Sequence, residues 1–84
     1  MRVIAILLLA ATLAAKEPPA APVNVNTATV EQLQTLPGVG PVMAREIVRY
    51  REKNGPFRRV EELLIIRGIS KKKLARMRPY VRVR

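Results

Sequence analysis

The chain has 84 residues, of which 16 are Lys or Arg and six are acidic, giving a formal net charge of +10. It contains neither Cys nor His, and its acidic residues are all Glu, which excludes a Ser-His-Asp set, a thiol nucleophile and a His/Cys zinc site. We therefore expect a protein that is not an enzyme, whose charge favours a polyanionic partner over a surface kept basic for solubility alone.

Residues 1–15, MRVIAILLLAATLAA, have the pattern of a secretory signal peptide. Arg2 supplies a short positive region, an apolar stretch follows, and small residues permit cleavage after Ala14 or Ala15. The apolar stretch is shorter than the ~20 residues that a helix needs to span a bilayer, so an uncleaved anchor is the less favoured alternative. We expect a periplasmic or secreted protein with no stable membrane span after cleavage.

Residues 16–22, KEPPAAP, are predicted to be an extended linker, because three prolines among small residues offer no core. The working domain is then residues 23–84. Within it, residues 30–40 (VEQLQTLPGVG) align with residues 60–70 (VEELLIIRGIS) at an offset of thirty positions. This internal repeat predicts two similar units, each made of a short helix, a tight glycine turn and a second helix.

In the first unit, the T-x-x-Q capping box at residues 29–32 predicts a helix over residues 30–35. Pro41 suits the first position of the next helix. An N–H at that position has no acceptor within the helix, so proline loses no hydrogen bond by lacking one. This second helix should run to residue 53 or 54 and stop at Gly55.

In the second unit, the first helix should begin near Arg59 or Val60. Ser70 is a natural N-cap for a helix over residues 71–78, and Pro79 should end that helix. These signals predict four short helices in two pseudo-repeats, which is an all-α fold.

The two ends of the domain, residues 23–26 and 81–84, alternate apolar and polar residues. This alternation predicts short extended termini, which we expect to lie beside each other. The apolar positions at helical spacing predict the core. Its members are Leu33, Leu36, Val39, Ala44, Ile47, Phe57, Val60, Leu63, Ile66, Ile69, Leu74 and Met77.

The first turn carries the most specific pattern in the chain. The stretch from Leu33 to Ile47 reads L-x-x-L-P-G-V-G-P-x-x-A-x-x-I, which resembles the helix-hairpin-helix motif. The longer stretch NVNTATVEQLQTLPGVGPVMAREIVRYREKNGPF, with VEELL, RGI and the closing PYV, resembles the ComEA-type competence DNA-receptor family. The motif is specific for a tandem helix-hairpin-helix fold, but less so for the pathway, since such pairs also occur in repair enzymes and nucleases.

The resemblance implies that each hairpin presents backbone N–H groups to a DNA phosphate, assisted by the positive end of the following helix dipole. Gly38 is expected to permit an unusual φ, and Gly40 to let the phosphate approach the backbone. The second hairpin departs from the pattern, with Ser70 in place of the second glycine. The three lysines that follow Ser70 lie in the first turn of the next helix, where the positive end of the helix dipole disfavours cations. A bound phosphate would offset this cost. The candidate DNA-binding residues are Gly38, Val39, Gly40, Val42, Arg45, Arg49, Gly68, Ile69, Ser70, Lys71, Lys72 and Lys73.

For the whole protein, the resemblance implies sequence-independent binding of double-stranded DNA by a periplasmic receptor in natural transformation. Its partners would be an inner-membrane DNA channel and the pilus machinery. No cofactor is expected, although a structural monovalent cation held by hairpin carbonyls stays open. Two alternatives remain: a sharp turn without any ligand, and an exported protein-interaction or structural module such as the photosystem subunit PsbU. The stripe formed by Arg45, Arg49 and Lys53 could equally follow the DNA or be a solvated face.

Overall fold

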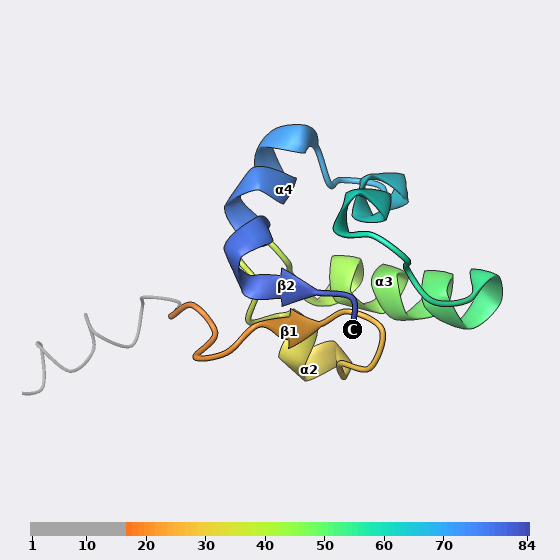
Figure 1. The fold of residues 1–84 in the computed structure, drawn as a ribbon, viewed down its shortest axis with the longest axis horizontal. Coiled ribbons are helices and arrows are strands. Elements are labelled where there is room, and N and C mark those ends of the chain that lie inside the picture. Colours follow the sequence, from red (N-terminus) through yellow and green to blue (C-terminus); the bar gives the residue numbers. More distant parts are fainter. Residues whose placement is uncertain (1–16) are drawn as a thin grey trace, which may run out of the picture.

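The computed structural model describes residues 17–84; the predicted signal peptide, residues 1–15, lies outside them. Along the chain, two units follow each other between two very short strands, and each unit consists of two helices joined by a tight glycine turn, as the ribbon in Figure 1 shows. Residues 17–22 form neither helix nor strand and lead into the first strand. None of the helices within residues 17–84 is both long and apolar enough to cross a bilayer.

The first unit consists of α2, Val30–Leu33, and α3, Pro41–Asn54. The predicted capping box is present, because the Thr29 side chain accepts from the Gln32 N–H and the Gln32 side chain accepts from the Thr29 N–H. α3 ends at Gly55, which has a φ of +88°. α2 is two residues shorter than predicted. After Leu33 the backbone N–H groups donate to the carbonyl three residues earlier, as in a 3₁₀ turn; the Thr35 N–H, for example, donates to the Gln32 carbonyl at 3.1 Å.

The second unit differs from the first in its opening helix. η1, Val60–Ile65, is a 3₁₀ helix, whereas the sequence favoured an ordinary helical turn there. α4, Lys71–Met77, is capped by Ser70 as predicted and passes directly into a second 3₁₀ turn, η2, Arg78–Tyr80. α4 ends at Met77, one residue before the predicted end at residue 78, and Pro79 follows inside η2, near the start of a helix where its missing N–H leaves no bond unmade.

The two ends of the domain meet, which confirms the predicted pairing. β1, Val23–Asn24, pairs in parallel with β2, Val81–Arg82, with Val23 opposite Val81. The Asn26 side chain extends this junction by donating to the carbonyls of Phe57 (2.9 Å) and Val83 (2.7 Å) and accepting from the Phe57 N–H (2.7 Å). One amide thus joins the start, middle and end of the domain.

A single apolar core lies between the two units. Every predicted core residue is buried except Val60, which is only partly buried at the edge of the core because it opens η1. Val25, Ala28 and Val81 add the strand ends to this core. No polar or charged side chain of residues 17–84 is buried, so the charge of the described domain lies at its surface.

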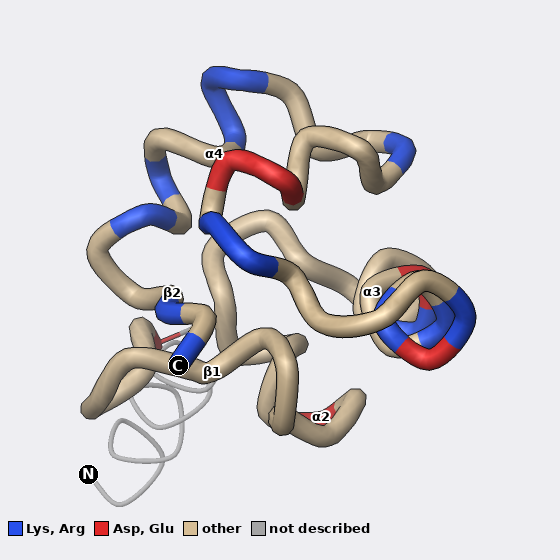
Figure 2. Tube along the Cα trace, turned by 45° about the vertical axis from the view of Figure 1, so that its right-hand side comes forward, with Lys and Arg blue, Asp and Glu red and all other residues tan. Residues whose placement is uncertain are grey.

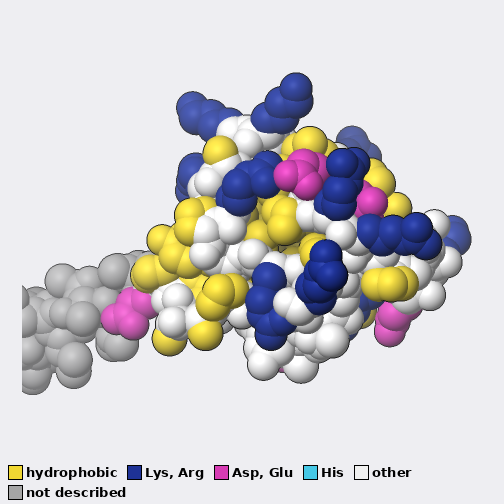
Figure 3. Space-filling model, viewed as in Figure 1, with side chains coloured by type: hydrophobic (Ala, Val, Ile, Leu, Met, Phe, Trp, Pro, Cys, Tyr) yellow, Lys and Arg dark blue, Asp and Glu magenta, His cyan; other side chains and the backbone are white. Residues whose placement is uncertain are grey.

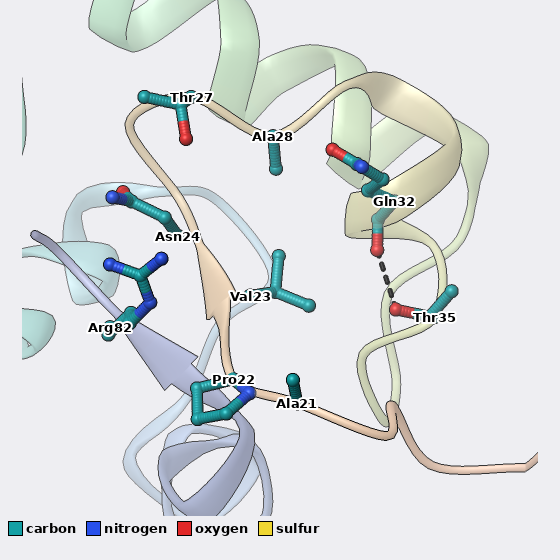
Figure 4. Close-up of a pocket in the computed structure, with 9 residues that line it drawn as sticks. All are labelled: Ala21, Pro22, Val23, Asn24, Thr27, Ala28, Gln32, Thr35 and Arg82. Carbon is teal, nitrogen blue, oxygen red and sulfur yellow. Dashed lines mark hydrogen bonds between the residues drawn. The ribbon is translucent and has the colours of Figure 1, made fainter.

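An open pocket of about 330 Å³ lies beside the strands, bordered by β1, α2 and Arg82. Figure 4 shows its lining, in which the Thr35 hydroxyl donates to the Gln32 carbonyl and Arg82 lies near Asn24. None of the residues of the two glycine turns lines it. The pocket is therefore separate from the surface that the sequence singles out.

Candidate nucleic-acid interface

The two glycine turns have the same internal geometry. Gly38 and Gly68 adopt φ values of +78° and +96°, in the left-handed region that the sequence led us to expect for Gly38. In each turn the next residue donates its N–H to the third preceding carbonyl: Val39 to Leu36 and Ile69 to Ile66, both at 3.1 Å.

The side chains of Val39 and Ile69 are buried, as the apolar spacing predicts, and the place of these residues among the candidate DNA-binding residues stays a prediction. Their side chains are 2% and 4% exposed, and both belong to the core. Because their N–H groups close the turn, they are already engaged. The two residues hold the shape of each turn while their neighbours form its outer surface.

The first hairpin is open at the start of α3. Gly40, the N-cap residue, has extended backbone (φ −97°, ψ −174°) and offers no side-chain cap. A Cβ at Gly40 would have no other atom within 4 Å, so the fold itself does not demand glycine there. Pro41 follows at the first helical position, and Val42 is 66% exposed. The first N–H groups of any α-helix lack acceptors within the helix, so this end of α3 presents backbone donors to solvent.

The second hairpin is closed by a side chain. The Ser70 hydroxyl accepts from the Lys73 N–H at 3.2 Å and so occupies one of the first-turn donors of α4. Lys71 and Lys72 are exposed beside it, whereas Lys73 is partly buried. The two hairpins therefore differ as the sequence suggests: one exposes backbone, the other exposes lysine side chains.

Two side chains cross between the hairpins. The stem of Lys73 lies over Gly38, where an added Cβ would be 3.2 Å from Cε and 3.3 Å from Cδ. In the reverse direction, the terminal methyl of Met43 lies 3.0 Å from the place of a Cβ on Gly68. The glycine turns therefore lie close enough to act as one surface.

The basic charge is distributed unevenly over the domain. α2 carries no basic residue in its last turn, whereas the α4 sequence is KKKLARM, as the blue segments in Figure 2 show. In the face seen in Figure 3, Lys and Arg side chains project along the upper edge over α4 and again beside the C-terminal strand. Arg45 and Arg49 are exposed on α3.

Carboxylates neutralise little of this charge. Within residues 17–84 the ion pairs are Arg49–Glu46 at 3.7 Å and Arg78–Glu61 at 2.8 Å. The hydrogen bond from Arg78 holds the pKa of the Glu61 carboxyl below its ordinary value. Among the described residues, the lysines at the start of α4 have no such partner, which leaves their charge available to an anion.

The structure adds two basic residues that sequence reasoning missed. Arg67 shares an open hollow with Gly40 and Val42, and Arg76 shares another with Gly38. Arg67 directly precedes the second turn glycine, which could have drawn attention to it. Nothing in the spacing of Arg76 indicates that it lies beside the same hollow as Gly38, because that placement depends on how the two units pack.

A family model described as a helix-hairpin-helix motif matches residues 19–82, most of the chain. The chain belongs to the helix-hairpin-helix family. In this family member, residues 17–84 contain no group of three or more His, Cys, Asp or Glu that could hold a metal ion.

The helix-hairpin-helix chain is similar to several known proteins. It is 42% identical over 62 residues to ComE operon protein 1 of Bacillus subtilis (strain 168), which covers 74% of this chain and 30% of that protein. This similarity confirms the resemblance to the ComEA-type family. The chain is 49% identical over 55 residues to endonuclease/exonuclease/phosphatase family domain-containing protein 1 of Homo sapiens, covering 66% of this chain and 10% of that protein.

A protein of Haemophilus influenzae with no described function is 46% identical over 56 residues, covering 66% of this chain and 50% of the relative. The chain thus spans a tenth to a half of the length of these three relatives. The matched stretch of each relative is 55–62 residues long.

Proposed function

We propose that this protein is an exported receptor that binds double-stranded DNA through its phosphate backbone, without reading base sequence and without catalysis. The observation that carries the proposal is the pair of adjoining hairpins, one with an uncapped backbone turn at Gly40 and one with exposed Lys71 and Lys72. Backbone donors and lysines suit phosphate oxygens, and contacts to phosphate carry no sequence information.

The resemblance to ComEA-type proteins supports a role in the uptake of external DNA. In such a role the receptor would hold incoming duplex in the periplasm and pass it to an inner-membrane channel after entry by a pilus. These two partners, and export itself, rest on family analogy and on the signal-like residues 1–15. Fractionation of expressing cells, with mass determination of the N-terminus, tests export: a periplasmic protein beginning at residue 15 or 16 supports it, and an unprocessed cytoplasmic protein contradicts it.

Titration of a 30-bp random-sequence duplex with the purified protein across a salt series, followed by fluorescence anisotropy, tests DNA binding. If ~4–6 phosphates are contacted, log K should fall against log salt with a slope of roughly −4 to −5. A second duplex of unrelated sequence should bind equally well.

A variant carrying Gly40→Val with Lys71, Lys72 and Lys73 each changed to Glu should lose this binding while its circular dichroism stays unchanged. Absence of binding by the unaltered protein at low salt would overturn the proposal. The exported protein-interaction alternative would then be the one to pursue.

A further inference from the structure

The crossing of Lys73 over the first hairpin follows the internal repeat. Residues 43 and 73 occupy the same place in the thirty-residue pattern, and so do Gly38 and Gly68. Each unit therefore sends the third residue of its second helix over the turn glycine of the other unit. The same contact occurs from each unit to the other, with Lys73 over Gly38 and Met43 over Gly68, so it is a regular part of the packing between the units.

The two crossing residues differ in charge. Met43 brings an uncharged methyl to Gly68, whereas Lys73 brings a four-carbon stem and an ammonium group to Gly38. Three stem atoms lie 3.2–3.4 Å from the position of a Cβ on Gly38, so the stem packs along its length and only its end is free to reach solvent. The ammonium group has no ion pair or side-chain hydrogen bond within residues 17–84.

We propose that Lys73, although it belongs to the second repeat, is a DNA-contacting residue of the first hairpin. Its charge stands beside the uncapped turn of Gly38 and Gly40, which has no lysine of its own, since Pro41, Val42 and Met43 begin α3. Lys71 and Lys72 are exposed and serve the second hairpin. The phosphate at the first hairpin is then held by backbone donors from one repeat and a cation from the other.

This inference rests on the proposed function, and a double-mutant cycle tests it. Lys73→Met removes the charge but keeps an unbranched stem of the kind that already packs over Gly68. It should weaken duplex binding about three- to tenfold near 0.1 M salt and make the log–log salt slope shallower by about one. In a Gly40→Val background, where the first hairpin is blocked, Lys73→Met should change affinity less than twofold, because both substitutions remove the same contact.

Lys72→Met is the matched control, with the same side-chain change one position earlier. It should weaken binding by the same factor in both backgrounds, as independent sites do. Thermal unfolding of Lys73→Met should match that of the unaltered protein, which separates loss of charge from loss of packing. Met43→Lys, the reverse exchange, should strengthen binding and steepen the salt slope.

Each result decides the question. Additive effects of Lys73→Met and Gly40→Val, or no effect of Lys73→Met at all, overturn the assignment of Lys73 to the first hairpin while leaving DNA binding intact. Absence of salt-dependent binding by the unaltered protein overturns the proposed function and this inference together.

Discussion

The two hairpins are built on one thirty-residue pattern but finish their turns in opposite ways. Both have a glycine at positive φ, followed by a buried apolar residue whose N–H closes the turn. Then the first hairpin places Gly40 before Pro41, and the second places Ser70 before Lys71. The positions that shape the turn agree between the repeats, and the positions that face outward differ.

This difference shows how a tandem repeat can divide one task. An uncapped helix start offers geometry, because its N–H groups have fixed directions, whereas a lysine offers charge on a flexible stem. In the second hairpin, one N–H of the first helical turn, that of Lys73, already donates to the Ser70 hydroxyl and is not available to a ligand. We expect the first hairpin to supply most of the directional contacts and the second most of the charge.

The largest effect should come from reversing charge at the second hairpin. Lys71→Glu with Lys72→Glu should weaken duplex binding roughly 100-fold at low salt and make the salt slope shallower by about two, since two phosphate contacts are lost. Fluorescence anisotropy over a salt series measures both quantities.

The matched control for charge reversal is Arg58→Glu with Arg59→Glu, which changes net charge equally at two exposed residues that precede η1. This pair should weaken binding much less. Equal losses for the two pairs would mean that overall charge, and not the hairpin, governs binding.

Alanine at the turn glycines should separate stability from binding. Gly38→Ala and Gly68→Ala should each destabilise the fold by about 1–3 kcal/mol, because an L-residue is strained at these positive φ values. Urea unfolding measures this loss. Only Gly38→Ala should also weaken DNA binding, since its new Cβ displaces Lys73, whereas a Cβ at Gly68 displaces an uncharged methyl. An equal loss of affinity in both variants would contradict the difference between the hairpins.

Exchanging the two N-cap residues should give smaller changes of opposite sign. Gly40→Ser should add a cap to α3 and raise stability by about a few tenths of a kcal/mol, and Ser70→Gly should lower it by a similar amount. At the same time Gly40→Ser should reduce DNA affinity a few-fold, because the new hydroxyl occupies a backbone donor. Urea midpoints and anisotropy check the two effects, and an affinity gain in Gly40→Ser would refute the role of open backbone.

The smallest effect should come from the ion pair between Arg78 and Glu61 of the second unit, which has no counterpart at the equivalent positions of the first unit. Arg78 lowers the pKa of Glu61, so the stabilisation is present above the ordinary Glu value and is lost as pH falls through the lowered pKa. The equivalent residues of the first unit are Glu31 and Val48, which cannot pair. Arg78→Gln should lower the urea midpoint slightly at pH 6, and this difference should disappear as pH falls below the lowered pKa of Glu61. A difference between the two proteins that persists throughout an acidic pH series would point to packing of the Arg78 stem instead.

Much of the fold was predictable because its signals are local. The capping box at Thr29, the stop at Gly55 and the cap at Ser70 each act within a few residues, and all three are present. The apolar spacing gave the core, with Val60 as its one partly buried member. Local signals suffice here because short helices joined by tight turns leave few ways to bury a single apolar stripe.

The remaining features depend on contacts distant in sequence, which spacing cannot reveal. Nothing in the residue spacing distinguishes the 3₁₀ helix η1 from an α-helix, and the crossings of Lys73 and Met43 follow from how the units pack. The same holds for Arg76, which lines the same open hollow as Gly38. Val39 and Ile69 were predicted to be buried from the apolar spacing, but the hydrogen bonds by which their N–H groups close the two turns became evident only from the structure.

The junction of the two ends has a consequence for when this domain can fold. The Val25 N–H donates to the Arg82 carbonyl at 3.0 Å, and Asn26 donates to the Val83 carbonyl across 57 positions of sequence. Segments near the start of the domain therefore cannot complete their hydrogen bonds until its last residues are present. Such long closures form late. A chain that emerges from a ribosome or a translocation pore N-terminus first would keep its ends unjoined until the final strand follows, and a nascent or truncated chain lacking residues 81–83 should be open to proteases.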